Sequence, residues 1–181
     1  MRTTLLLIAA LSLSVPATVA AQQQAIPGPV IFSAGNTFPV DNPSFVTRTD
    51  IEYKVAFELA AAAPSPDQLN TSLNSVARFI NMHAADGVPV TQIKAAVVVH
   101  GPAGWELLSD EAYREKYGVD NPNSELIREL VDQGMTIVLC GQTAASRGIP
   151  RDGLADGVQL ALSAMTAFVV LQADGYMVNP W

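Results

Sequence analysis

A buried strand is the strongest structural signal in this sequence. Residues 93–99 form a nearly continuous apolar run that is rich in valine, as expected for a strand covered on both faces of a parallel sheet. Strand-like segments at 53–59 and 136–139 precede and follow it, with helical patterns between them. Repeated strand–helix–strand units predict parallel pairing with right-handed crossovers. We therefore expect an α/β fold, a three-layer α/β/α sandwich with a mostly parallel sheet of about five strands.

Three helices are expected around these strands, each with a polar capping residue before it and a glycine after it. These pairs are Ser65 and Gly87, Ser109 and Gly118, and Asn123 and Gly134. A polar side chain at the cap accepts hydrogen bonds from free N–H groups, and glycine readily adopts the left-handed conformation that ends many helices. Pro66 stands at the first position of the first helix, where its missing N–H costs little.

The C-terminal section fits two interpretations. Residues 158–162, 166–172 and 176–178 match a strand, a helix and a last short strand. The competing interpretation is one long helix over residues 157–174, because apolar periodicity does not separate the two cases well.

The first 21 residues are typical of a secretory signal peptide. Arg2 is followed by an apolar stretch, and small residues up to Ala21 provide a cleavage site. We expect a periplasmic or secreted bacterial protein with no membrane span after cleavage, since the apolar stretch is shorter than the about 20 residues of a spanning helix. An uncleaved anchor is the alternative. Residues 22–50, rich in proline, are expected to form an irregular lead-in to an α/β domain at 51–181.

The charge balance narrows the possible partners. The chain has a formal net charge of -7, with 10 basic and 17 acidic residues. Such a chain is a poor partner for nucleic acid or an anionic membrane surface. Two histidines and one cysteine at unmatched spacings do not form a metal site, and the sequence carries no cofactor fingerprint. We therefore expect neither a metal nor a cofactor.

Two expected strand ends carry chemically capable side chains. His100 follows the strand at 93–99, and Cys140, the single cysteine, follows the strand at 136–139. Ligands bind beyond the carboxyl ends of strands in open parallel sheets, and the two residues approach each other if these strands are neighbours. A histidine near a cysteine can hold the reactive thiolate. Arg147 adds a positive charge, and Thr143 is expected to cap a short helical turn.

The loops after these strand ends are candidates for ligand binding. Their candidate residues are Gly101, Trp105, Gly141, Gln142 and Thr143. The structural alternative carries comparable weight, because free cysteine is among the most buried residue types. Buried histidines are also commonly satisfied by backbone hydrogen bonds. The residues alone leave both interpretations of Cys140 and His100 open.

The segment around Cys140 resembles the cysteine segment of the DsrE/DsrF-like family, which includes TusD-type sulfur-relay subunits. In that family a strand ends in Val-x-Cys or Leu-Cys, small residues follow, and Arg-Gly-Ile or Arg-Gly-Val closes the loop. Here Leu139-Cys140 is followed by Arg147-Gly148-Ile149 at the same spacing. Further matching positions are Asn81, His100-Gly101, Asn121-Pro122-Asn123, Ser163 to Thr166, and Gly175-Tyr176. The resemblance covers roughly residues 53–181.

This resemblance implies an α/β/α fold, association into homo- or hetero-oligomers, often trimers or hexamers, and a cysteine that accepts sulfur. The chain would then be an exported sulfur carrier that holds a persulfide on Cys140 and exchanges it with a donor or acceptor protein. Known relay members work in the cytoplasm, whereas this chain is expected to be exported. The alternative is a non-catalytic oligomeric module that binds a small ligand and packs Cys140 inside. Whether the chain is an enzyme of the sulfurtransferase type stays open.

Overall fold

The computed structural model describes residues 23–179, so the expected signal peptide lies outside the described residues. Within them, one parallel sheet has the strand order β4-β3-β2-β1-β5. Its strands are β1 Tyr53–Leu59, β2 Ile93–Val99, β3 Thr136–Cys140, β4 Val158–Ala161 and β5 Met177–Asn179. The expected α/β fold is confirmed, and β2 and β3 are neighbours in the sheet.

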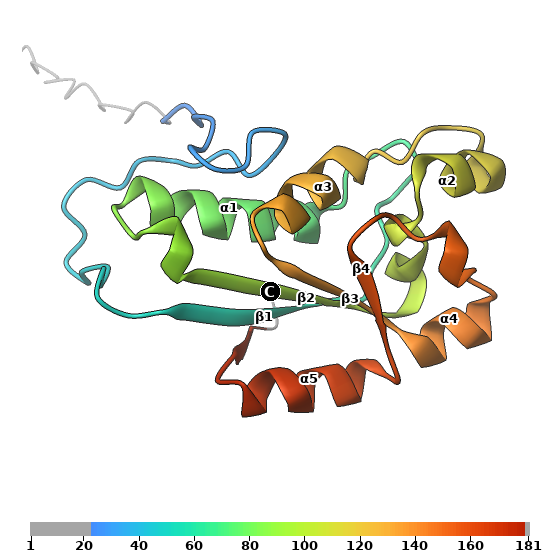
Figure 1. Ribbon diagram of the computed structural model, residues 1–181. Coiled ribbons are helices and arrows are strands. Elements are labelled where there is room, and N and C mark those ends of the chain that lie inside the picture. The colour runs from blue at the N-terminus through green and yellow to red at the C-terminus, as the bar shows by residue number, and fades with distance from the viewer. Residues whose placement is uncertain (1–22, 180–181) are drawn as a thin grey trace, which may run out of the picture.

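Helices lie on both faces of the sheet (Figure 1). The α-helices are α1 Thr71–Ala85, α2 Asp110–Tyr117, α3 Ser124–Asp132, α4 Gly141–Arg147 and α5 Ala164–Ala173. Within the described residues there are also 3₁₀ helices, namely η1 Val90–Gln92, η2 Gly101–Leu107 and η3 Arg151–Gly153. In Figure 1, α1 and α3 lie on one side of the sheet and α5 lies on the other.

Alternation along the strands divides the interior into two unequal cores. Val97 and Val99 of β2 enter the large core under α1 and α3, whereas Val98 enters a smaller core with Ala167 and Leu171 of α5. Side chains of a strand point alternately to the two faces, so a central strand with both faces covered must be apolar throughout. This explains the nearly continuous apolar run of β2, in which Lys94 near the start is the one charged residue.

The first helix begins later than expected, and the prediction that Ser65 caps it was wrong. Asn70 is the cap, with its Oδ1 accepting from the N–H groups of Ser72 at 2.8 Å and Leu73 at 3.3 Å. Ser65 instead forms a turn, in which its hydroxyl donates to Asp67. Asn70 is almost fully buried and makes further polar contacts inside the domain, so tertiary packing selects the cap.

The other helix ends confirm most of the sequence interpretation. Ser109 caps α2 through a bond from the Ala112 N–H, and Gly118 ends it in the left-handed conformation. Asn123 precedes α3 but makes no capping bond there. Its Oδ1 accepts from the Asn70 N–H at 2.9 Å instead, so it ties the start of α1 to the start of α3.

The strand–helix–strand interpretation of the C-terminal section is confirmed, and the single long helix over residues 157–174 is wrong. Gly157 has a positive φ of 82°, which no right-handed helix contains. Ser163 caps α5, with its Oγ accepting from the Thr166 N–H at 3.0 Å. These two residues separate β4 from its flanking segments.

The described part of the lead-in has an irregular backbone and lies over α1. Asn81 of α1, which is fully buried, holds it through both ends of its side-chain amide. Its Nδ2 donates to the Ile31 carbonyl at 2.9 Å, and its Oδ1 accepts from the Ile31 N–H at the same distance. Gly28 passes so close to Asn81 that a Cβ there would overlap the amide. Across residues 23–179, no helix is both long and apolar enough to cross a bilayer.

Candidate functional site

Cys140 lies at the junction of a central strand and a helix. It is the last residue of β3 and the N-cap residue of α4, and only 6% of it is exposed. The apolar strand places the residue at the carboxyl end of the sheet, and the small residues after it allow the chain to turn into α4 at once. Thr143 lies inside this helix, so the prediction that Thr143 caps it was wrong.

Hydrogen-bond donors surround the sulfur of Cys140. Burial alone raises the pKa of the thiol, but the bonds to its sulfur outweigh burial, and the pKa is lowered from the ordinary value. The donors are the N–H groups of Thr143, Ala164 and Gln142 and the hydroxyl of Thr143. Bonds of this kind favour the charged form of an acid. The site therefore favours the thiolate, which is the nucleophilic form of cysteine.

The donors come from the first turns of two helices that are far apart in the sequence. Thr143 and Gln142 belong to α4, whereas Ala164 is the first residue of α5. Gly141 allows this approach, because a Cβ there would lie 2.4 Å from the Ala161 carbonyl oxygen. Gln142 adds a bond from its Nε2 to the Leu162 carbonyl at 3.4 Å. The end of β4 and the start of α5 are thus held against the cysteine loop.

The structure places His100 beside Cys140 in the sheet register. Val99 and Leu139 are the last paired residues of β2 and β3, and the two candidates follow them in extended conformation. Because side chains alternate along strands, both point to the α5 side of the sheet. Neighbouring strands lie about 4.8 Å apart, so the expected approach of the two strand ends is realised in the backbone.

The side chain of His100 is bonded to a carboxylate. Its Nε2 lies 2.8 Å from Oε1 of Glu58 on β1, and the two side chains are 30% and 44% exposed. The sequence interpretation did not single out Glu58. The available signal was a charged residue near the carboxyl end of an otherwise buried strand. Glu58, His100 and Cys140 thus occupy the ends of three adjacent strands.

A second bridge joins the ends of β2 and β3. The Gly101 N–H donates to Thr143 Oγ1 at 3.0 Å, and the Thr143 hydroxyl helps to lower the pKa of Cys140. Gly101 adopts a left-handed φ of 59°, which a side chain would strain. The two candidate glycines and Thr143 therefore shape the surroundings of the sulfur.

Two further candidate residues, Arg147 and Trp105, make no contact with Cys140 that the structure records. Arg147 is the exposed last residue of α4, about 10 Å along the helix axis from Cys140 at 1.5 Å per residue. The half-buried Trp105 of η2 stacks under Lys116, whose Nζ lies 3.6 Å from the ring centroid. Within residues 23–179, no group of three or more His, Cys, Asp or Glu residues is arranged to hold a metal ion.

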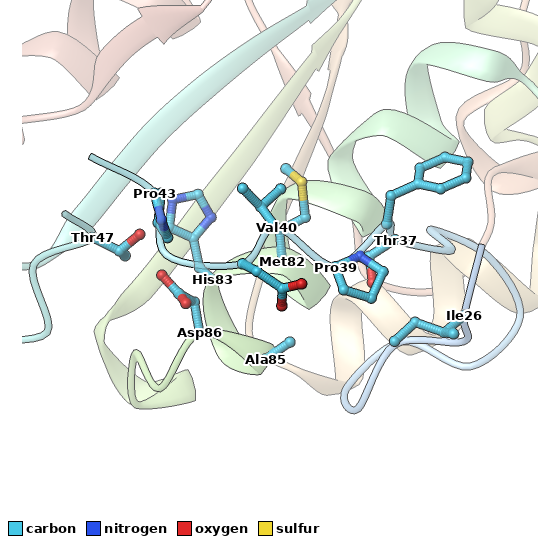
Figure 2. A pocket seen from close by; sticks show the side chains of 12 residues that line it. Ile26, Thr37, Pro39, Val40, Pro43, Thr47, Met82, His83, Ala85 and Asp86 are labelled. Atoms are coloured by element: carbon cyan, nitrogen blue, oxygen red, sulfur yellow. The ribbon is translucent and has the colours of Figure 1, made fainter. Parts of the chain in front are cut away.

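A hollow of about 490 Å³ lies elsewhere on the molecule, between the lead-in and the last turns of α1. Figure 2 shows the labelled Val40, Pro39 and Thr47 of the lead-in facing Met82 and His83 of α1. The Nδ1 of His83 donates to the Phe79 carbonyl at 2.7 Å. None of the residues that line this hollow belongs to the cysteine site, so the hollow and the thiol are separate features.

Comparisons with solved structures show the same fold in two proteins. The protein of unknown function MTH1491 from Methanobacterium thermoautotrophicum is 21% identical with a TM-score of 0.54, and the match covers 72% of this chain and 100% of that one. The ychN protein from E. coli is 16% identical with a TM-score of 0.52, and the match covers 71% and 98%. A search of curated protein sequences gave no match.

The family assignment comes from the sequence. The sequence model of the DsrE/DsrF-like family matches residues 47–180, which includes the whole sheet and the loops around Cys140. The resemblance stated from the cysteine segment is thereby confirmed. The chain belongs to the DsrE/DsrF-like family.

Proposed function

We propose that this protein is a thiol-based sulfur carrier that holds a persulfide on Cys140. The observation that carries the proposal is the position of Cys140 at the end of β3 and the start of α4, where nearby N–H groups of α4 and α5 lower the pKa of the thiol. These donors stabilise negative charge on the sulfur and lower the pKa of Cys140. Membership in the DsrE/DsrF-like family supports the same chemistry.

The transfer step needs no added oxidant or reductant. The Cys140 thiolate attacks the outer sulfur of a donor persulfide, R–S–SH, and a new S–S bond forms on the cysteine. The S–S bond of the donor breaks, and R–S⁻ leaves with the bonding electron pair. The reverse step passes the sulfur to an acceptor thiolate. A carrier of this kind needs a stable thiolate more than it needs a complete acid–base set.

His100 and Glu58 provide the proton chemistry of the proposal. A histidine that lies near a thiol, with its ring oriented by a third group, is a recurring arrangement for activating a nucleophile. Glu58 engages Nε2 of His100, which leaves Nδ1 to take the thiol proton. Arg147 lies at the other end of α4, so in this proposal it contributes only positive charge at a distance.

Export and self-association complete the proposal. The signal-like pattern of residues 1–21 supports a periplasmic or secreted location, and the family resemblance supports a homo-oligomer, such as a trimer or hexamer, that meets a sulfur donor or acceptor protein. Gly101, Gly141, Gln142 and Thr143 would line the position of the transferred sulfur.

The low exposure of Cys140 favours a second candidate, a binding module in which the cysteine is structural. A thiol that is 6% exposed reacts only if a reagent reaches it, and buried structural cysteines are inert. In this alternative the ligand would bind at the strand ends near His100, Trp105 and Gln142. The two candidates make opposite predictions for the reactivity of the native thiol.

Intact-mass analysis separates the two candidates. The full protein, without reductant, is incubated with inorganic polysulfide, desalted and weighed. The carrier is expected to gain the mass of one sulfur atom, and Cys140→Ser is expected to gain none. If the native protein shows no gain and the thiol reacts with iodoacetamide only after denaturation, the carrier proposal is lost and the binding module is favoured.

A further inference from the structure

The outer surface of α5 is unusually apolar. Ala167 and Leu171 bury one side of this helix against the sheet, yet the opposite side is also hydrophobic. Four exposed residues define what we call the α5 patch: Leu162, which precedes the helix cap Ser163, and Met165, Val169 and Val170 on the helix, which are 73%, 76%, 65% and 54% exposed. A surface helix normally turns polar residues to solvent, and a helix that is apolar all round is normally buried.

The sheet face under α5 is covered incompletely. Strands lie about 4.8 Å apart, so a five-stranded sheet is about 19 Å wide, whereas a helix with its side chains is about 10 Å across. Figure 1 shows α5 under this face, opposite α1 and α3. Val178 of β5, which points to the same side as α5, stays 40% exposed. Parallel sheets are covered on both faces, so this face calls for an additional cover.

The absence of charged residues around α5 indicates which partner covers this face of the sheet. Residues 157–173 contain no Asp, Glu, Lys or Arg, in a chain with a net charge of -7. Two copies of so acidic a chain repel each other wherever their carboxylates approach. Where the contact surface carries no charged side chains, carboxylates of the two copies do not approach each other and this repulsion is absent. A strongly basic partner would find no carboxylates to bind on such a surface. The α5 patch therefore suits contact with a second copy of the same chain.

The size of the patch fits such a contact. The four patch side chains and Val178 expose on the order of 500 Å² of apolar surface. One side of a standard protein interface buries about 800 Å², of which about 57% is non-polar. The exposed apolar area of the patch is thus close to what one partner contributes.

We infer that the α5 patch is the surface through which two copies of this chain associate. Leu162 and Met165 flank Ala164, whose N–H group bonds to the sulfur of Cys140. A second copy seated on the patch therefore also covers the surroundings of the thiol. This last consequence, control of access to Cys140, rests on the proposed function. The association itself does not.

A matched pair of substitutions tests the contact. Val169→Glu adds a charge to the patch, and Val46→Glu adds the same charge to an equally exposed valine of the lead-in, 73% against 65% exposed. Sedimentation velocity of the full protein is expected to show an oligomer for the wild type and for Val46→Glu and a monomer for Val169→Glu. Circular dichroism checks that both variants fold, and Met165→Gln, which adds no charge, should weaken the association as well.

Two results would overturn the inference. One is a wild type that stays monomeric at every concentration tested. The other is an oligomer that Val169→Glu and Met165→Gln leave unchanged. The test is independent of sulfur transfer, because Cys140→Ser is expected to associate like the wild type. If polysulfide loading fails while Cys140→Ser still forms the patch-dependent oligomer, the proposed function fails and the contact surface stands.

Discussion

Nε2 of His100 lies 2.8 Å from Oε1 of Glu58, and this pair sits beside Cys140 on three adjacent strand ends. The sequence suggested His100 as a proton acceptor for the thiol but gave it no orienting partner. A carboxylate that fixes one ring nitrogen of a histidine orients the ring and directs the other nitrogen toward its substrate. Removing the carboxylate of Glu58 therefore tests the role of His100.

The substitution Glu58→Gln is expected to slow alkylation of Cys140 near neutral pH by about 3- to 10-fold, less than the roughly 100-fold or more of a complete general base, because His100 itself stays in place. The amide keeps the size of the side chain and removes the carboxylate that orients the ring of His100. The measurement is the rate of iodoacetamide labelling of the native protein. Glu52→Gln, which removes an exposed charge near the start of β1, is the control and should leave the rate unchanged. Equal rates for all three proteins would remove His100 from the proposed mechanism.

Thr143→Val is expected to raise the pKa of Cys140, since a hydroxyl that donates to the sulfur favours its charged form. Valine keeps the shape of threonine but cannot donate to the sulfur. The pH dependence of thiol alkylation measures the shift. Ser146→Ala removes another α4 hydroxyl, which donates to the Thr143 carbonyl at 3.3 Å, and should shift the pKa little. An unchanged titration in Thr143→Val would show that the backbone donors alone set the pKa.

Glu106 is expected to make the stability of the protein depend on pH. Burial raises the pKa of its carboxyl group, although bonds from the Ala63 N–H and the Asn70 amide oppose the shift. Because the pKa is raised in the folded state, its stabilising contribution is complete below the unfolded value and is lost as pH rises through the folded value. Urea unfolding over a pH series should show this loss, and Glu106→Gln should flatten it. A wild type and variant with parallel pH curves would contradict the assignment.

Asn81→Ala is expected to loosen the lead-in and to lower the free energy of unfolding by about 2–4 kcal/mol, because several buried backbone groups lose their partners at once. Asn81 bonds Val30, Ile31, Ala34 and Gly35 of the lead-in. Urea unfolding and limited proteolysis of the lead-in measure the two effects. Asn74→Ala, which removes a single bond to the Gly35 N–H, should cost clearly less. Similar losses in both variants would contradict this role of Asn81.

Elements with local signals could be predicted from the sequence. The bounds of β2 at Ile93–Val99 and the end of α2 at Gly118 follow from a buried apolar run and from a glycine at a helix end. The start of α1 could not be predicted, because Ser65 and Asn70 are both good caps. The choice between them depends on the contacts of Asn70 with Glu106 and Asn123 across the domain.

The surroundings of Cys140 were only partly predictable. The strand-end positions of His100 and Cys140 follow from the pattern of a parallel sheet. The N–H group of Ala164 could not be identified, since a backbone donor has no side-chain signal and lies 24 residues away in the sequence. Glu58 was missed for a related reason. Its role depends on β1 lying beside β2, and the order of strands in a sheet cannot be inferred from the residues of any one strand.

Gly141 links the reactivity of the Cys140 sulfur to the position of the edge strand β4. Its backbone lies so close to the Ala161 carbonyl that a side chain at this position would push the end of β4 away from the cysteine loop. Edge strands fray before central ones as a protein warms. Detachment of β4 would draw the first turn of α5 away, so the thiol would lose its acidity while the rest of the domain remained folded.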